Sequence, residues 1–275
     1  MPRPGEFYDY ATGGKLEIDL RAAAPGKFKL LRQFAYIDRK YPYEPFVVPR
    51  DLFNWQTDLA SIPRYFTWLV PGLGNHLPAV LLHDGLVVDR GAPREHIGPE
   101  ISREEADRIL RDAMLELGTP LIRRWLIWTA VVLATAWLDI ERRWLWRARW
   151  IVTVLIIGTL GTIATLDLFD IWNVLPWMDD QAWWRELLLG GLFAVAIPFG
   201  LALLWGRLWI AAAIFGIAFA FLIHVTLVIA VLYSLYAALE WLLRPLDPAR
   251  HVVPGVEAGG APTVTRVDGS FADGV

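Results

Sequence analysis

The chain contains no cysteine and only three methionines among its 275 residues. Disulfide bonds and thiolate metal sites are therefore excluded. The first twenty residues have no apolar core, so we expect no cleavable signal peptide. The net charge of −3 provides no large positive surface, and we expect no nucleic-acid partner.

Charged residues are also scarce in the second half of the chain. Three runs there contain none: Trp150–Leu166 with 17 residues, Leu187–Gly206 with 20 and Leu208–Leu239 with 32. A helix of about 20 apolar residues crosses the hydrocarbon core of a bilayer. We therefore predict at least three membrane helices and a lipid bilayer as the main partner. A buried soluble bundle is the alternative, but its helices should carry a polar face that these runs lack.

Tryptophan and arginine indicate where the membrane boundaries lie. Ten of the fifteen tryptophans fall between Trp125 and Trp184, at the ends of the apolar runs, as in an interfacial belt. Four arginines precede the first run, whereas residues 167–186 carry five acids and one arginine. Because basic residues favour the cytoplasmic side, we expect a multi-pass protein of a bacterial inner membrane with a cytoplasmic N-terminal domain. Residues 208–243 fit either one long helix or a hairpin, so the side of the C-terminus stays open. Inside them, His224 indicates an interhelical hydrogen bond.

The N-terminal half has a different pattern. Short β-type runs at residues 28–31, 34–37 and 45–48 are separated by charged or proline-containing turns. So small a sheet needs helices to pack against. We predict an α+β fold in which a small N-terminal β-meander packs on helices and a helical transmembrane region follows. The predicted divisions are an N-terminal extension 1–27, a cytoplasmic domain 28–149, a transmembrane region 150–243 and a flexible tail 244–275.

Two helices of the cytoplasmic domain carry the candidate site. The first spans roughly residues 75–88 and contains two adjacent titratable side chains, His83 and Asp84. The second begins at a capping box, residues 102–105, and Asp107 flanks its apolar stripe. If these helices pack together, Asp107 can orient the His83 imidazole and stabilise its charged form. Purely structural roles, a hydrogen-bonded core histidine and a solvated acid, stay open for both residues.

Two further residues are candidates on weaker grounds. Asp58 lies in a polar segment before the first helix, where it either caps a turn or directs its carboxylate toward the His83 site. His76 precedes His83 by seven residues and so shares its helix face. Its place next to a glycine-rich loop favours a surface or capping role.

Three sequence blocks resemble the phage and bacterial family called domain of unknown function 1353. The blocks are Thr57-Asp58-Leu59-Ala60-Ser61-Ile62-Pro63-Arg64, Leu77-Pro78-Ala79-Val80-Leu81-Leu82-His83-Asp84 and Arg103-Glu104-Glu105-Ala106-Asp107-Arg108-Ile109-Leu110-Arg111-Asp112-Ala113-Met114. The likeness covers roughly residues 28–138, and the order and spacing of the blocks agree with the family. It implies no activity, because the family has none assigned, and the membrane half lies outside it.

A second resemblance concerns the histidine and its acids. A helical His-Asp pair followed by an Asp on the next helix is similar to the arrangement in phospholipase A2 enzymes. That resemblance implies His83 as general base and Asp107 as the residue that orients it. It also implies calcium, a cation that prefers oxygen ligands, with Asp84 and loop carbonyls as its ligands. Asp58, if its carboxylate points toward His83, is a further candidate ligand. The chain departs from those enzymes at Val87, where they have a tyrosine, and in lacking their cysteines and a clear glycine-rich calcium loop.

These residues fit three functions. The first is a membrane-anchored hydrolase in which His83 activates water against a lipid substrate or another envelope ester. The second is a non-catalytic, phage-derived scaffold or interaction module in which the contact between His83 and Asp107 only stabilises the fold. The third is a metal-dependent phosphohydrolase whose ligands are His76, His83, Asp84 and Asp107. Whether the chain is an enzyme, its substrate and metal, and its oligomeric state stay open.

Overall fold

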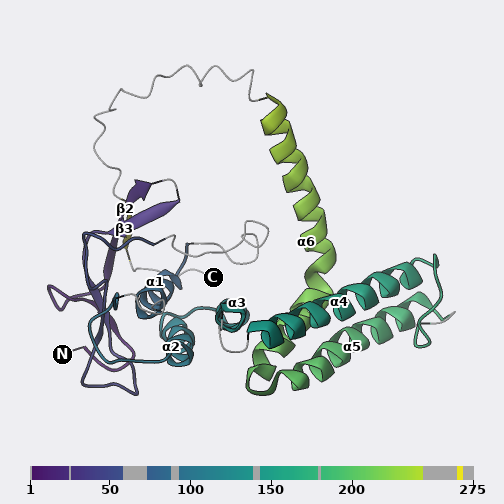
Figure 1. The fold of residues 1–275 in the computed structure, drawn as a ribbon, viewed down its shortest axis with the longest axis horizontal. Helices are drawn as coiled ribbons and strands as arrows, with labels where there is room; N and C mark the ends of the chain where they lie inside the picture. Colours follow the sequence, from purple (N-terminus) through teal and green to yellow (C-terminus); the bar gives the residue numbers. More distant parts are fainter. Residues whose placement is uncertain are drawn as a thin grey trace. The chain divides into compact units, whose positions relative to one another are not determined.

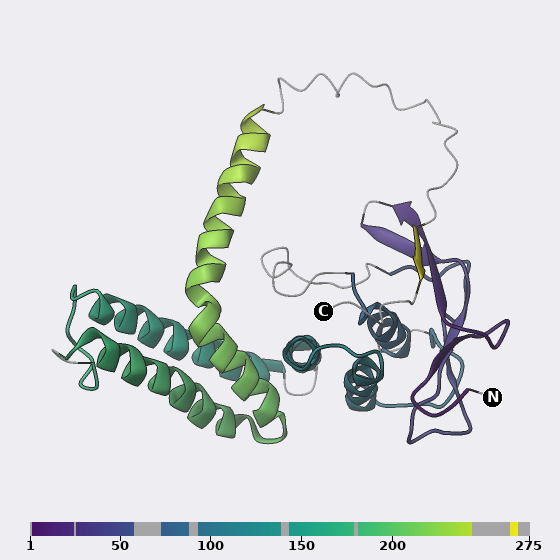
Figure 2. The same cartoon turned by 180° about the vertical axis from the view of Figure 1, so that it is seen from behind.

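The computed structural model divides the chain into two compact units. The first comprises residues 1–124 and 231–275, and the second residues 125–230. Within them the structure describes residues 2–24, 26–57, 73–87, 93–138, 143–178, 181–243 and 265–268. Figures 1 and 2 show the ribbon from opposite sides.

The first unit contains two small antiparallel sheets. In one, the strand order is β1-β4-β5, with β1 at Phe7–Asp9, β4 at Phe34–Tyr36 and β5 at Phe46–Val48. In the other, the order is β3-β2-β6, with β3 at Lys27–Leu30, β2 at Glu17–Ala24 and β6 at Thr265–Asp268. Every residue of β4 and β5 is buried.

The predicted α+β class is confirmed. The three predicted strand runs correspond to β3, β4 and β5. They divide between two sheets, because β3 pairs with β2 and β4 pairs with β1. Strands β1 and β2 belong to the predicted extension 1–27, and β6 belongs to the predicted tail 244–275. Both segments therefore supply strands to the sheets of the first unit, and the rest of the tail lies outside the described residues.

Two helices of the first unit lie side by side next to the strands in both ribbon views (Figures 1 and 2). Helix α1 spans Leu77–Leu86 and packs against both α2 and β5. Helix α2 spans Arg103–Glu116. The Ser102 side chain accepts a hydrogen bond from the Glu105 backbone N–H, as the capping box predicts. The helix ends two residues before Gly118, whose φ of +68° is readily adopted by glycine.

The second unit is helical. Its elements are α3 at Leu121–Leu138, α4 at Arg143–Leu168, α5 at Trp183–Ala202, a 3₁₀ turn at Leu203–Leu208 and α6 at Trp209–Leu243. The first residues of α3 and the last residues of α6 belong to the first unit. The three predicted apolar runs are thus all helical. The predicted division between residues 149 and 150 falls inside α4.

Two segments are long and apolar enough to cross a membrane. They are Trp144–Leu168 and Trp183–Val225, and the second continues through the bend at Gly206. In the most apolar stretch of each segment only 17% and 11% of the residues are buried, so most side chains there are not covered by the rest of the protein. The prediction of at least three spans and the prediction of a cytoplasmic N-terminal domain stay untested.

A small aromatic and alanine core holds the second unit together near the start of α4. Trp146 and Trp205 pack against each other within it, and the Trp205 indole N–H donates to the Thr153 hydroxyl at 3.2 Å. The remaining buried members are Leu133, Ala136, Ala202, Ala212 and Ala213. Small residues at such contacts let helix backbones approach closely.

Candidate functional site

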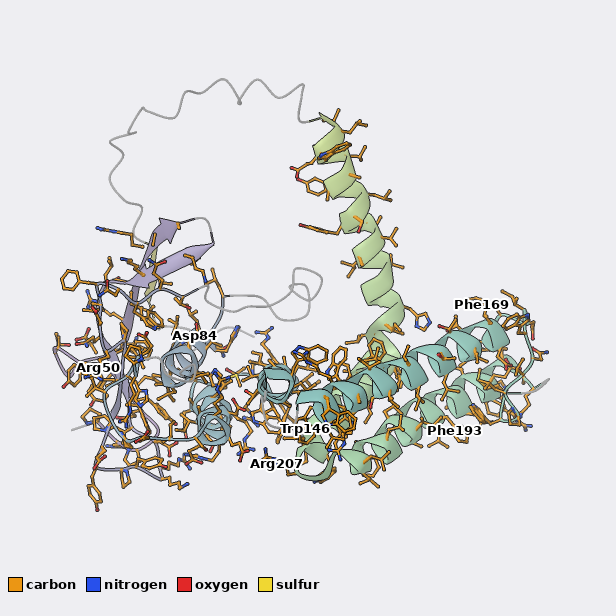
Figure 3. All side chains as sticks on the ribbon, viewed as in Figure 1. Arg50, Asp84, Trp146, Phe169, Phe193 and Arg207 are labelled. Atoms are coloured by element: carbon orange, nitrogen blue, oxygen red, sulfur yellow. The ribbon has the colours of Figure 1, made fainter. Side chains whose placement is uncertain are left out.

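Helix α1 presents the candidate site residues. Pro78 lies in its first turn, where a missing backbone N–H costs nothing. Most of its apolar side chains are buried, which fixes the helix against α2 and β5. His83 and Asp84 lie in its last turns (Asp84 is labelled in Figure 3). Because successive helical residues differ by about 100°, these two neighbours reach different partners.

His83 faces α2 and meets Asp107. The distance from His83 Nε2 to Asp107 Oδ1 is 2.8 Å, and the two side chains are 12% and 5% exposed. The structure thus brings together the two residues that were predicted to form a pair. An ionised carboxylate only accepts hydrogen bonds, so the hydrogen of this contact lies on Nε2. No described residue hydrogen-bonds to Nδ1 of His83, and in the neutral ring that nitrogen is an acceptor.

Asp107 owes its inward position to its place on α2. The buried face of this helix comprises Ala106, Ile109, Leu110, Ala113 and Met114, and Asp107 is buried beside it. Asp112 on the same helix is 37% exposed and binds Arg108 and Arg111. Asp107 therefore points inward, whereas Asp112 lies at the surface of the helix.

Asp84 is bound to the sheet side of the domain. The Thr57 hydroxyl donates a hydrogen bond of 2.6 Å to Asp84 Oδ2. The backbone of Thr57 pairs with that of Phe28 in β3: each residue donates its N–H to the carbonyl of the other. This contact ties the end of α1 to the edge of a strand. Sequence reasoning assigned Thr57 no role, because a pairing between residues so far apart leaves no local pattern.

The predicted metal ligands are only partly covered by the described residues. Asp58 lies outside the described residues, so its predicted role is not addressed. Among the described residues, no group of three or more histidines and acids is placed to hold a metal ion. His76 is 1% exposed at the N-cap of α1, so the expected surface position is wrong and only the capping position holds. The four-ligand phosphohydrolase set is therefore not assembled by the described residues, whereas the calcium site stays a prediction.

A second histidine, His96, stabilises the end of α1. Its Nδ1 is 3.2 Å from the Gly85 carbonyl and its Nε2 is 3.0 Å from the Pro99 carbonyl. The side chain is buried and packs near Phe46 of β5. Both contacts hold backbone that flanks the His83 site. The sequence contained no signal for this role, since His96 lies in a loop without periodicity.

Charged residues on the other side of α2 form a network. Arg108 donates to both carboxylate oxygens of the buried Asp38, at 2.8 and 3.3 Å, and also binds Glu105 and Asp112. Burial alone would lower the pKa of Arg108, but its hydrogen bonds with Asp38 and Glu105 raise that pKa above its usual range. The guanidinium therefore stays charged and fastens α2 to the segment after β4.

Part of the chain matches a known protein family. Residues 28–131 match the family described as Protein of unknown function (DUF1353). This part of the chain is a DUF1353 domain. The domain begins within β3, ends within α3 and contains Thr57, His83 and Asp107.

The remaining comparisons add no relative. No curated protein and no solved structure matches the chain. The likeness to phospholipase A2 therefore gains no support from them. The role of the DUF1353 domain has to be argued from the contacts of its own residues.

Proposed function

We propose that the chain is a membrane-anchored hydrolase whose DUF1353 domain uses His83 as a general base against an ester, with lipid as the expected source of substrate. The contact that supports this proposal most directly joins His83 Nε2 to Asp107 Oδ1 at 2.8 Å. Asp107 holds the ring in one orientation and one tautomer. Nδ1 is then the nitrogen available to accept a proton from water.

The proposed reaction needs a proton acceptor close to neutral pH, which an imidazole provides. Water attacks the ester carbonyl carbon while His83 Nδ1 takes one proton from it. The Asp107 carboxylate stabilises the resulting imidazolium. The tetrahedral intermediate collapses as the bond to the alcohol oxygen breaks, and the imidazolium returns its proton to that oxygen. The acid product and the alcohol leave, and His83 is neutral again. Every step is assigned to residues of the chain itself, and none to calcium.

The helical unit supports the proposed membrane location. Large apolar side chains on α4 and α5 point outward, among them Leu155 at 61%, Leu188 at 65% and Leu192 at 59% exposure. In water such surfaces would associate, whereas a bilayer covers them at no cost. A hydrolase attached to these helices would act near lipid esters, and its local substrate concentration would be high.

The test is an ester-hydrolysis assay on the full chain, purified in a non-ionic detergent. p-Nitrophenyl esters of increasing chain length and phospholipid vesicles are suitable substrates. His83→Gln should lower kcat by about 100-fold or more, since a general base typically contributes that much. Asp107→Asn should lower kcat in part, because an amide cannot stabilise the imidazolium. Asp112→Asn, a matched change on the same helix away from His83, should leave the rate unchanged.

A non-catalytic interaction module is the second candidate. The observation that favours it is the small exposure of the pair, 12% for His83 and 5% for Asp107. A contact between two helices with so little access to solvent is also what a structural role requires. In that case His83→Gln lowers the free energy of unfolding by about 1–3 kcal/mol, and the wild-type chain hydrolyses no ester of either substrate series. Full activity in His83→Gln would likewise refute the base assignment.

A further inference from the structure

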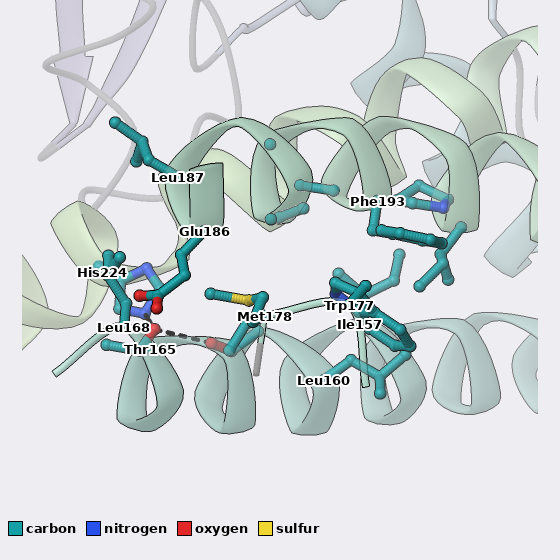
Figure 4. Close-up of a pocket in the computed structure, with 18 residues that line it drawn as sticks. Ile157, Leu160, Thr165, Leu168, Trp177, Met178, Glu186, Leu187, Phe193 and His224 are labelled. Atoms are coloured by element: carbon teal, nitrogen blue, oxygen red, sulfur yellow. Dashed lines mark hydrogen bonds between the residues drawn. The ribbon is translucent and has the colours of Figure 1, made fainter. Parts of the chain in front are cut away.

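A pocket between α4, α5 and α6 in the second unit has walls that are almost entirely apolar. Its volume is about 160 Å³. Trp177 and Phe193 stack at 4.4 Å and form part of one wall, and Ile157 lies along another. Three polar residues also line it: Thr165, Glu186 and His224. Figure 4 draws these three toward one end, with Trp177, Phe193 and Ile157 toward the other.

The positions of these residues in their helices explain why the three polar side chains lie at one end of the pocket. Thr165 lies in the last turn of α4 and Glu186 in the first turn of α5, so both flank the loop that connects these helices. His224 comes from α6, and its Nε2 is 2.6 Å from Thr165 Oγ1. This contact is the interhelical hydrogen bond predicted for His224. The pocket thus has a polar end at the loop and an apolar interior, as an amphiphile requires.

The hydrogen bonds determine which atom of His224 is available. The Thr165 hydroxyl has one hydrogen, which it donates to the Gly161 carbonyl at 2.7 Å. Toward His224 the same hydroxyl must therefore accept, so Nε2 of His224 carries a hydrogen. In the neutral ring Nδ1 is then an acceptor.

Glu186 supplies the second acceptor and a negative charge. It is 5% exposed, and its Oε1 accepts a hydrogen bond from the Gln181 backbone N–H at 3.2 Å. In the described part of the chain, no lysine, arginine or histidine forms an ion pair with Glu186, and Arg185 stacks over Trp184 instead. A buried charge without a counter-ion is costly, so a cation at this end would be stabilising.

The last turn of α4 and the loop after it add further negative potential. Asp167 of α4 is 1% exposed, and its Oδ2 accepts hydrogen bonds from the backbone N–H groups of Val174 and Leu175 in the loop, at 3.0 and 2.8 Å. Asp170 lies in this loop. An anionic headgroup would be repelled here, whereas a primary ammonium carries a positive charge and three donors for Glu186 and His224.

We infer that this pocket binds an amphiphile with a primary ammonium head and an apolar tail. The head lies against Glu186 and His224, and the tail lies along Trp177, Phe193 and Ile157. This inference concerns the helical unit alone and does not depend on the chemistry of His83.

Dodecylamine, which is protonated at neutral pH, is the probe for the test. The full chain in a non-ionic detergent is titrated with dodecylamine, dodecanol and dodecanoate, and the midpoint temperature of unfolding is measured. We expect a saturable rise with the amine and none with the alcohol or the acid. An equal rise with dodecanol would overturn the recognition of the ammonium head. Lysophosphatidylethanolamine is the second probe: a similar rise identifies an aminophospholipid as the source, and no rise identifies a simple alkylamine.

Two variants locate the site. Glu186→Gln removes the charge but keeps an acceptor for Gln181, and it should weaken amine binding at least about tenfold, that is, by 1.4 kcal/mol or more. Gly161→Leu places a side chain where nothing lies within 4 Å of an added Cβ, and it should fill the pocket and abolish binding. Gly200→Leu, on α5 and also without neighbours within 4 Å, does not line the pocket and should bind normally. If Glu186→Gln fails to fold, the result for Gly161→Leu decides whether the amine binds in this pocket. An amine effect that persists in Gly161→Leu would overturn the proposal.

Discussion

Gly85 of α1 lies directly against Val48 of β5. A Cβ on Gly85 would be 2.6 Å from Val48 Cγ1 and 2.8 Å from Cγ2, which is closer than real side chains approach. Val48 is fully buried and cannot move aside. This close approach sets the distance between helix and sheet, and thereby the position of His83 two residues earlier.

Gly85→Ala should therefore lower the free energy of unfolding of the first unit by about 1–3 kcal/mol, the usual cost of overpacking. Hydrogen exchange of α1 peptides, measured by mass spectrometry in the full chain, gives a local readout. The control is the same change in a Val48→Ala background, where the space is open and the cost of Gly85→Ala should shrink. Equal costs in both backgrounds would show that Val48 does not limit this position.

Acid should destabilise the first unit through Asp9. Its carboxylate accepts hydrogen bonds from the Thr12 backbone and hydroxyl at 2.8 and 2.9 Å, and it lies 3.3 Å from an Arg32 nitrogen. Burial raises the pKa of Asp9, but these contacts outweigh burial and leave the pKa below its usual range. The folded pKa is thus lower than the unfolded one. The resulting stabilisation is complete above the unfolded pKa of about 4 and is lost as the pH falls through the folded pKa.

Protonation of Glu105 should also destabilise the first unit in acid. Burial raises its pKa, but hydrogen bonds from Arg108 and Lys40 lower it overall. Urea unfolding followed by hydrogen exchange from pH 7 down to about pH 2 should show a loss of stability that begins near pH 4. Asp9→Asn should flatten the curve, and adding Glu105→Gln should flatten it further. An unchanged curve in the double variant would rule out both acids as its cause.

The contact of His83 with Asp107 was predictable, because each helix carries local signals of its own. Ser102 marks the start of α2, Gly118 marks its end, and the apolar stripe between them places Asp107 on the inner edge. The contact of Thr57 with Asp84 was not predictable in this way. It joins residues 27 positions apart, one of them on an edge that is paired with β3.

The pairing of the strands also could not be predicted from local sequence signals. The short β-type runs between turns identified the strands that became β3, β4 and β5, but such runs carry no information about which strands pair. Strand β6 pairs with β2 across more than 240 positions of the chain, in the register of Leu20 with Thr265. In the helical unit the long apolar runs predicted helices well, since periodicity and length are local. The pocket with Glu186 and His224 depends on how three helices meet, and only the structure shows that.

Gly216 of α6 should be essential for the contact with α5. A Cβ at this position would lie 2.8 Å from Pro198 Cβ and 3.1 Å from Ile157 Cδ1. Gly216→Ala should separate α5 from α6 and destabilise the second unit by about 1–3 kcal/mol. Gly200→Ala is the matched control, because it meets nothing within 4 Å and should be neutral or stabilising by up to about 1 kcal/mol. Thermal unfolding in detergent measures both, and equal midpoints would exclude a close contact at Gly216.

The absence of cysteine makes the membrane topology directly testable. A single cysteine placed at an exposed position becomes the only thiol of the chain. Suitable positions are Tyr43 in the DUF1353 domain at 94% exposure, Trp172 between α4 and α5 at 60%, Leu204 before the bend at 68% and Leu243 at the end of α6 at 53%. If α4 and α5 each cross the bilayer, Tyr43→Cys and Leu204→Cys share one side and Trp172→Cys lies on the other.

A membrane-impermeant maleimide added to intact cells distinguishes the two sides. Because the arginines before α4 favour the cytoplasm, we expect Trp172→Cys to be labelled in intact cells, and Tyr43→Cys and Leu204→Cys only after lysis. Leu243→Cys then reports whether α6 crosses as one helix, in which case it is labelled from outside. Labelling of all four positions only after lysis would contradict a spanning arrangement and leave the apolar helices as a contact surface for protein. Labelling of Tyr43→Cys in intact cells would reverse the orientation and place the His83 site outside the cell.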